Sequence, residues 1–363
     1  MTDNYTLAFS CSTLGPKSFQ KILIKFGTSE KGWNASEEEF AEIGIVLKTY
    51  KNFVEFKNGF DCDQYNVRLK KAGVEFVAFT DKRYPKGLRK IENPPIGLFC
   101  NGNVKLLKST FSIGVVGTRK ITQYGQDVTE MLVKELVKNG AVIVSGLALG
   151  VDGLAHRVTT ENKGLAIAVL ACGVDCCLPS ENYSLYSSIL KSNGLVVSEY
   201  PLSAPPFKGT FLARNRIVAA LSDGVLITEA AEGSGSLVTA AYALQYGKKV
   251  FAVPGQITSR MSDGSLQLLK QGAKLVSNAE DILQEFSSAG WRNNSQFSKN
   301  KQFANLNLTK EEKKIVFLIQ NEGLTIDEIS KLSKLPVSKI FIAISNLEIR
   351  GIIRNAGGKI SAK

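Results

Sequence analysis

The stretch that decides the fold runs from residue 111 to residue 152 and reads FSIGVVGTRKITQYGQDVTEMLVKELVKNGAVIVSGLALGVD. It holds an apolar, β-branched run that ends at Gly117, a helical pattern over 126–139, and a second β-branched run over 141–144. Two strands that are apolar on both faces, joined by a helix, indicate a parallel pair with a crossover connection. The stretch therefore predicts an α/β fold built on a doubly wound, Rossmann-like sheet.

The same alternation extends in both directions along the chain. Further strands are expected at 165–170, 195–197, 225–228 and 249–253, separated by helical stretches, and segments 74–79 and 94–98 add elements upstream. These runs predict an extended Rossmann-like domain over residues 66–290 with a mostly parallel sheet.

Two smaller modules are expected at the ends of the chain. Residues 1–65 contain a turn, Leu14-Gly15-Pro16-Lys17, that opens an amphipathic helix closed by Gly27, and a second helix is expected over 37–50. This pattern suits a SAM-like helical module of the helix-hairpin-helix kind. The polar run 291–308 reads as a linker.

Residues 309–363 follow the linker. Thr309 is expected to cap a helix that extends to Gln320, and further helical patterns cover 325–332 and 337–350. A hairpin around Gly357-Gly358 then completes the order typical of a winged-helix module.

Composition bounds the class of function. The 363 residues are 44% hydrophobic and 21% charged, which is the balance of a globular protein. Lys and Arg number 45 against 33 Asp and Glu, giving a net charge of +12, and residues 1–65 contribute nothing to this surplus. A polyanionic partner is expected. No apolar stretch approaches the ~20 residues that span a bilayer, and no secretory signal is visible, so we expect a cytoplasmic protein without membrane contact.

Residue usage argues against several kinds of site. His156 is the single histidine, and the six cysteines form no C-x-x-C pair, so no metal site is expected and the cysteines read as free thiols. Neither a P-loop nor a G-x-S-x-G elbow occurs, and no G-x-G-x-x-G is followed by a ribose-binding acid. We therefore expect no cofactor.

Three loops rich in Gly, Ser and Thr follow predicted strands: Gly117-Thr118-Arg119, Ser145-Gly146 and Gly233-Ser234-Gly235-Ser236. The carboxyl ends of parallel strands meet at one edge of a sheet, where helix N-termini and backbone N–H groups attract phosphate. Arg119 adds a fork of donors that suits a charged backbone. The three loops together predict a phosphate-binding edge.

The segment 205–216, PPFKGTFLARNR, places three basic groups and two aromatic rings between a strand and a helix. Basic groups for phosphates and an aromatic face for a base are what single-stranded nucleic acid binding requires. The alternative is that Phe207 and Phe211 anchor the loop on the core while Arg214 and Arg216 are solvated.

In these motifs the sequence resembles the DprA/Smf family of DNA-processing proteins. The resemblance covers residues 66–290 and rests on an ordered set of motifs: Gly117-Thr118-Arg119, Tyr124-Gly125, Ser145-Gly146-Leu147-Ala148, Asp152, Ala155-His156, Leu170, Gly173-Val174-Asp175, Pro179, Asn182, Ser198-Glu199-Tyr200-Pro201, Arg214-Asn215-Arg216, Glu229-Ala230, Ser234-Gly235-Ser236-Leu237, Thr239-Ala240 and Val250–Gly255.

The resemblance implies a non-enzymatic protein that binds and protects incoming single-stranded DNA, usually as a homodimer through the Rossmann-like domain, and loads the RecA recombinase during natural transformation. Phosphate contacts would come from the glycine loops, Arg119 and Lys208, and Phe211 would stack on a base. Arg214, Asn215 and Arg216 would hold that loop or reach the DNA backbone. The implied DNA-binding residues are Gly117, Thr118, Arg119, Ser145, Gly146, Lys208, Phe211, Arg214, Asn215, Arg216, Gly233, Ser234, Gly235 and Ser236.

The chain departs from the family pattern at three positions. Leu212 stands where proline is usual, which predicts a less rigid loop. Ser180 stands where many members have Lys or Arg, so one phosphate contact is expected to be absent. Leu266 replaces an asparagine that would brace a loop by a hydrogen bond.

Two other functions remain open from the sequence. Related Rossmann-like enzymes hydrolyse nucleoside monophosphates with a P-G-G-x-G-T-x-x-E motif, and here Thr239 occupies the place of its glutamate, while Glu199 and Glu229 remain as strand-end carboxylates. The other function is recruitment of a protein, because the helix over 337–350 has few of the cations that a DNA-recognition helix carries.

Overall fold

The structure, a computed structural model, describes residues 3–109, 111–289, 309–319, 324–333, 335–350, 352–356 and 359–362. Contacts within the chain divide it into two compact units, Met1–Trp291 and Arg292–Lys363. The predicted linker, residues 291–308, and the predicted hairpin turn at Gly357-Gly358 lie outside the described residues. The domain boundaries at 65 and 290 stay predictions.

The first unit is built on one nine-stranded sheet whose strand order is β1-β2-β6-β5-β4-β3-β7-β8-β9. Neighbouring strands are parallel from β6 to β9, whereas β2 runs antiparallel to both β1 and β6. This arrangement confirms the mixed α/β fold with a mostly parallel sheet. The strands are β1 (Val74–Ala78), β2 (Gly97–Gly102), β3 (Ser112–Val116), β4 (Val142–Ser145), β5 (Ala166–Val169), β6 (Leu195–Ser198), β7 (Gly224–Ile227), β8 (Lys249–Ala252) and β9 (Lys274–Leu275).

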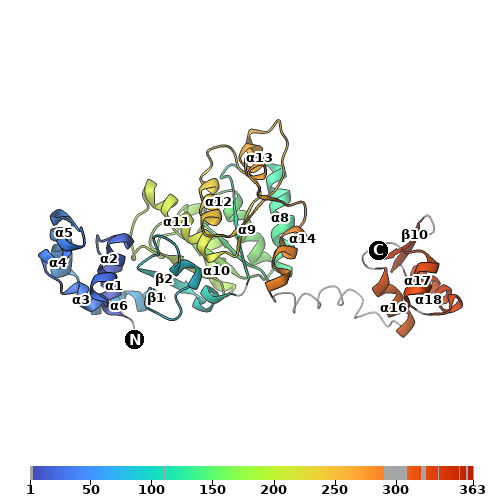
Figure 1. Cartoon of the computed structure of the whole chain (residues 1–363), viewed down its shortest axis with the longest axis horizontal. Coiled ribbons are helices and arrows are strands. Elements are labelled where there is room, and N and C mark those ends of the chain that lie inside the picture. Colours follow the sequence, from blue (N-terminus) through green and yellow to red (C-terminus); the bar gives the residue numbers. More distant parts are fainter. Residues whose placement is uncertain are drawn as a thin grey trace. The chain divides into compact units, whose positions relative to one another are not determined.

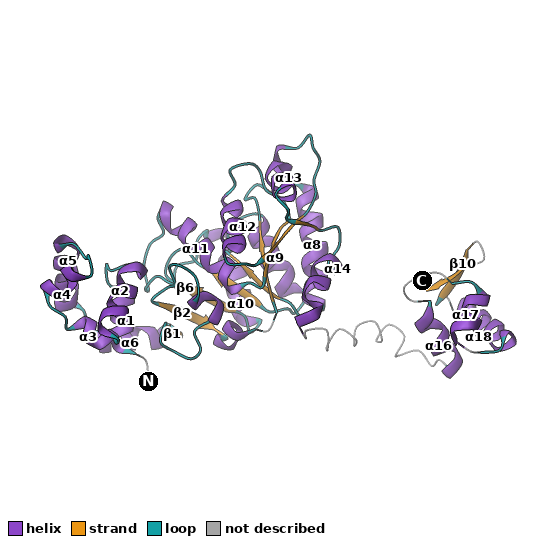
Figure 2. Cartoon of the chain, viewed as in Figure 1, coloured by secondary structure: helices purple, strands orange, loops and turns teal. Residues whose placement is uncertain are grey.

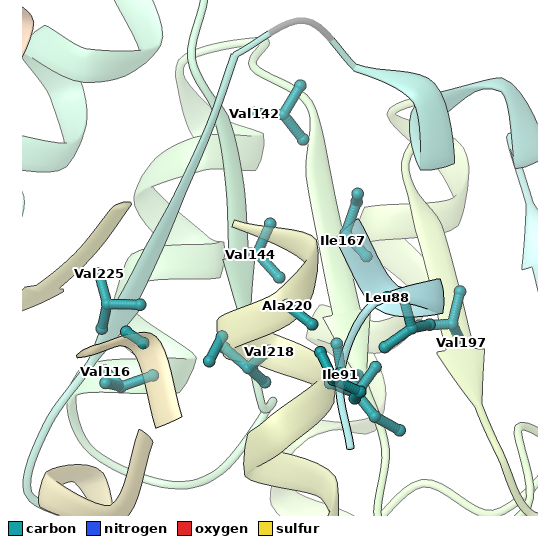
Figure 3. Close-up of a cluster of buried hydrophobic side chains, with 14 of the residues drawn as sticks. Leu88, Ile91, Val116, Val142, Val144, Ile167, Val197, Val218, Ala220 and Val225 are labelled. Carbon is teal, nitrogen blue, oxygen red and sulfur yellow. The ribbon is translucent and has the colours of Figure 1, made fainter. Parts of the chain in front are cut away.

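Helices enclose the sheet, as the purple helices around the orange strands in Figure 2 show. Val142 and Val144 belong to one buried cluster, and Ile143 between them belongs to another, because successive side chains of a strand point to opposite faces. Figure 3 shows part of the first cluster, which also includes Val218 and Ala220 of α11. The helices and 3-10 turns of this part are α7 (Lys86–Arg89), η1 (Val104–Lys108), α8 (Gln123–Lys138), α9 (Val151–Glu161), η2 (Ser180–Asn182), α10 (Tyr183–Lys191), α11 (Lys208–Leu221), α12 (Gly235–Gln245), η3 (Arg260–Ser262), α13 (Asp263–Lys270), α14 (Glu280–Leu283) and η4 (Gln284–Ala289).

The N-terminal helices, blue in Figure 1, pack around a cluster of aromatic rings. The rings of Phe9 and Phe53 are stacked with centroids 5.4 Å apart. The single helix expected over 37–50 is wrong: α4 stops at Glu42 and α5 starts at Leu47, because Gly44 between them has φ +72°. These helices are α1 (Asn4–Cys11), α2 (Pro16–Phe26), α3 (Ser29–Trp33), α4 (Glu37–Glu42), α5 (Leu47–Gly59) and α6 (Cys62–Lys71).

The second unit contains α16 (Lys310–Leu318), α17 (Ile326–Ser333) and α18 (Val337–Ile349), followed by the antiparallel pair β10 (Ile353–Ala356) and β11 (Lys359–Ala362). Thr309 caps α16 by accepting a hydrogen bond from the N–H of Glu312, as expected. The elements follow the predicted order, and the winged-helix assignment stays a prediction. Within the described segments of the whole chain, none of the helices has the length and apolar character needed to cross a bilayer.

Candidate nucleic-acid interface

A cleft of about 730 Å³ lies at the carboxyl edge of the sheet, beside β3 and β7. These strands adjoin where the chain order reverses, since β3 to β6 extend one way from this point and β7 to β9 the other. Open α/β sheets bind ligands at such a reversal. The loop after β3, the loop after β7 and the first turns of α11 line this cleft.

Most of the residues implied by the family resemblance come together here, although they are separated by more than 100 positions in the chain. Gly146 lies beside the cleft, in an apolar pocket of about 230 Å³ that shares Arg119, Phe211 and Arg214 with it. The implied residues that line the cleft itself are Gly117, Thr118, Arg119, Lys208, Phe211, Arg214, Asn215, Gly233, Ser234, Gly235 and Ser236.

Glu229, at the end of β7, holds the loop that follows β3. Its backbone carbonyl accepts a hydrogen bond from the N–H of Thr118 at 2.8 Å, and its carboxylate accepts from the N–H and hydroxyl of Thr122 at 2.9 and 2.6 Å. A Cβ at Gly117 would lie 2.6 Å from that carbonyl oxygen, so only glycine permits this approach. The loop that follows β3 and the loop that follows β7 are therefore held together by these hydrogen bonds.

Arg214 lines the cleft and connects the elements around it by hydrogen bonds. It is buried and donates from Nη1 to the carbonyl of Val169, at the end of β5, and from Nε to Oδ1 of Asn215 at 3.2 Å. Asn215 in turn donates to the carbonyl of Gly235 at 3.0 Å. A Cβ at Gly146 would lie 2.0 Å from Arg214 Nη1, which explains a glycine at that turn. The chain of contacts links β5, α11 and the glycine loop before α12.

The cleft surface carries groups suited to a polyanion. Arg119 and Lys208 are exposed, and the Arg119 guanidinium lies 5.3 Å from the centre of the Phe211 ring. The N-termini of α11 and α12 open into the cleft, and Ser234 caps α12. The cations and helix ends can bind phosphates, and the half-buried Phe211 ring offers an aromatic surface beside them.

Ser145 and Arg216 lie outside the lining of the cleft. Ser145 is fully buried at the end of β4, and its hydroxyl donates to the carbonyl of Val115 at 2.6 Å. Arg216 forms an ion pair with Glu199 at 2.5 Å, and both side chains are only 8% exposed. The Ser145 side chain therefore holds the end of β4 against β3 and is not available at the surface. Of the two roles left open for Arg216, its contacts favour holding the loop.

Burial shifts the pKa values of two more titratable side chains, Asp152 and His156. The carboxylate of Asp152, at the start of α9, accepts from the N–H of Gly146 at 3.1 Å, and burial raises its pKa while the nearby charge of Arg214 opposes the rise. His156 is fully buried, which lowers the pKa of its ring to about 4. At neutral pH the ring is therefore uncharged and sealed from solvent, which does not suit a general base.

The burial of His156 predicts an acid-sensitive stability. The unfolded chain takes up a proton near the ordinary pKa of 6.5, whereas the folded chain resists it until about pH 4, so the free energy of unfolding falls as pH drops through this window. Between pH 7 and pH 5 the wild-type protein is expected to lose about 2 kcal/mol more than the His156→Gln variant. Urea unfolding at both pH values measures the difference, and parallel losses in the two proteins would contradict it.

The three departures from the family pattern have different surroundings. Leu212 is exposed at the cleft, and Ser180 is exposed in η2. Leu266 is half-buried, and the neighbouring Ser265 hydroxyl is buried without a hydrogen-bond partner among the described residues. The expectations of a less rigid loop, an absent phosphate contact and an absent brace stay predictions.

Several lining residues were not selected from the sequence. Lys120 directly follows Arg119, and its charge could have marked it. Met261 lies in the 3-10 turn η3 between β8 and α13, and no local pattern points to it. Phe207 is exposed, so the anchoring role considered for it is wrong. Among the described residues no cluster of His, Cys, Asp and Glu could hold a metal ion, and all six cysteines are free thiols.

Comparisons with known proteins agree with this arrangement. Residues 75–287 match the family model of DNA recombination-mediator protein A. The chain is 42% identical over 213 residues to DNA processing protein DprA of Bacillus subtilis, covering 59% of this chain and 71% of that protein. It is 30% identical over an alignment of 386 residues to Protein Smf of Synechocystis sp., covering 98% and 97% of the two chains.

Two solved structures are also similar. DNA processing protein A from Streptococcus pneumoniae gives a TM-score of 0.67 at 36% identity and covers 78% of this chain and 97% of its own. DNA processing protein A from Helicobacter pylori, described for its single-stranded DNA binding mode, gives a TM-score of 0.54 at 37% identity and covers 60% and 96%.

Proposed function

Because the chain belongs to the DprA/Smf family of DNA-processing proteins, we propose that its cleft binds single-stranded DNA. The observation that carries the proposal is the convergence of two glycine loops, two helix N-termini and exposed Arg119 and Lys208 around the half-buried Phe211 ring. The phosphates lie on the amides and cations, and a base stacks on the ring. The binding mode described for the Helicobacter pylori relative supports the same ligand.

Binding is expected to depend strongly on salt. If the cleft neutralises about 4–6 phosphates, log K falls against log salt with a slope of about −3 to −4 for single strands. Fluorescence anisotropy with a labelled oligo(dT) at several salt concentrations measures the slope. Duplex of the same length is expected to bind worse, because its paired bases cannot reach Phe211. A flat response to salt, or equal affinity for duplex, would contradict the proposal.

We further propose that the bound strand is protected and handed to the RecA recombinase, and that the protein acts as a homodimer in the cytoplasm. One feature of the first unit supports self-association: β9 is an edge strand of the sheet, and its Leu275 is 51% exposed beside that open edge. Size-exclusion chromatography with light scattering tests the dimer. A RecA strand-exchange assay with DNA covered by single-strand binding protein tests the loading.

The role we propose is binding without catalysis. The two strand-end carboxylates that could serve as acid or base already have partners, since Glu199 pairs with Arg216 and Glu229 holds Thr122. Thr239, in the place of the hydrolase glutamate, is buried. Incubation with AMP and related nucleotides tests this, and release of ribose phosphate above background would favour the enzyme.

Recruitment of a protein by the second unit has its own support. Its helix α18 exposes Val337, Phe341 and Ile342, and Leu332 at the end of α17 is exposed as well. Apolar side chains in this number suit a protein partner better than a DNA groove.

A further inference from the structure

Phe207 is a large aromatic residue whose side chain is exposed to solvent. It immediately precedes α11, and 65% of its surface is exposed. Single exposed apolar residues are ordinary on a protein surface, so exposure alone says nothing about function. Its position is informative, because Pro206 before it lines the apolar pocket and Lys208 after it lines the cleft.

The loop that carries Phe207 is fastened at several points. The buried N–H of Leu202 donates to the Tyr65 hydroxyl of α6 at 2.8 Å, and the Asp175 carboxylate accepts from the N–H of Ser203 at 2.8 Å. At the other end, the buried Thr210 hydroxyl donates to the Phe207 carbonyl at 2.8 Å and accepts from its N–H at 3.2 Å. The backbone of Phe207 therefore has a defined place before any ligand arrives.

The ring itself rests against the first turn of α11. A Cβ at Gly209 would lie 3.4 and 3.7 Å from two carbons of the Phe207 ring, an ordinary van der Waals distance, so the ring lies close to the start of the helix. One side of the ring thus contacts the helix start, and the rest faces water. An aromatic ring placed in this way, beside an exposed lysine and a helix N-terminus, has the composition of a stacking platform for an unpaired base.

We propose that Phe207 is a second base-stacking residue, which holds a nucleotide of the strand where it leaves the cleft over Lys208 and the first turn of α11. The proposal rests on single-stranded DNA binding in the cleft and extends the path of the strand beyond it. Phe211 and Phe207 then serve different nucleotides. Because every base has an aromatic face, the contact adds affinity without sequence preference.

Anisotropy titrations of the full chain with labelled oligo(dT) of two lengths, about 6 and about 20 nucleotides, test the proposal. Phe207→Ala is expected to weaken binding of the longer strand roughly 5- to 150-fold, the range that corresponds to one stacked base, and to affect the shorter strand less. Phe207→Tyr keeps a ring and is expected to bind nearly as the wild type does.

Two further variants serve for comparison. Phe211→Ala is expected to weaken binding of both the shorter and the longer strand. Ile24→Ala removes an exposed apolar side chain of α2, which contributes nothing to the cleft lining, and serves as the control.

An abasic strand of the longer length separates stacking from an effect on the fold. The Phe207→Ala variant should bind this strand as the wild type does, because a backbone without bases leaves nothing to stack. If Phe207→Ala binds oligo(dT) with wild-type affinity, or weakens the abasic strand equally, the stacking role is overturned while the cleft proposal stands. If the wild type shows no salt-dependent binding at all, both proposals fall together.

Discussion

Replacing Arg216 by methionine is expected to lower the free energy of unfolding of the first unit by about 3–5 kcal/mol. The side chains of Arg216 and Glu199 are 8% exposed and lie 2.5 Å apart, so the substitution leaves a carboxylate buried without its partner. Burial already raises the pKa of Glu199, and the charge of Arg216 opposes that rise. Urea unfolding followed by circular dichroism measures the loss.

Two variants frame this prediction. Arg216→Met combined with Glu199→Gln removes the unpaired charge and is expected to recover part of the stability. Lys138→Ala breaks the exposed pair with Glu135 on the last turn of α8 and is expected to cost no more than about 0.5 kcal/mol. A loss for Arg216→Met as small as that of Lys138→Ala would show that the buried pair does not stabilise the fold.

The second large effect concerns affinity. Arg119→Ala is expected to weaken single-stranded DNA binding roughly 10- to 150-fold, since it removes the proposed charge-assisted phosphate contact and the cation that lies 5.3 Å from the Phe211 ring. The loss of affinity should be about equal for all DNA sequences, because a contact to phosphate does not depend on the base. The slope of log K against log salt should become less negative by about 0.7. Anisotropy titrations at several salt concentrations measure both quantities.

Lys138→Ala provides a matched control for net charge. It also removes one positive charge, but Lys138 is the last residue of α8, and no residue of this helix lines the cleft. Its binding curve and salt slope should equal those of the wild type. An Arg119→Ala variant that loses affinity while its salt slope stays unchanged would show that Arg119 positions Phe211 without contacting phosphate.

The sheet and the cleft loops could be predicted for a common reason. Strands buried on both faces must be apolar throughout, so runs such as 111–117 and 141–144 can be recognised from composition alone. Glycine at positions 117 and 146 likewise reflects a steric demand, because Glu229 and Arg214 occupy the space of a side chain. The two-residue strand β9 gives too short a pattern to detect.

Whether a given polar side chain is buried or exposed could not be predicted from the sequence. The motif Arg214-Asn215-Arg216 reads as three polar groups, yet the first and last are buried and make different contacts, to Val169 and Glu199. Val169 ends β5 and Glu199 directly follows β6, and both come near α11 only when the sheet forms. The same holds for Met261, which reaches the cleft from a distant loop. Local sequence specifies which residue types are present, and long-range packing decides which of them reach the surface.

The hydrogen bond from Leu202 to Tyr65 makes the first helices part of the support of the loop before α11, even though none of their residues lines the cleft. A chain shortened to start at β1 would keep every cleft residue but lose the Tyr65 hydroxyl, so the loop before α11 would lose one of the hydrogen bonds that hold it. A change in the first helices can therefore alter how firmly this loop is held while every residue that lines the cleft stays the same.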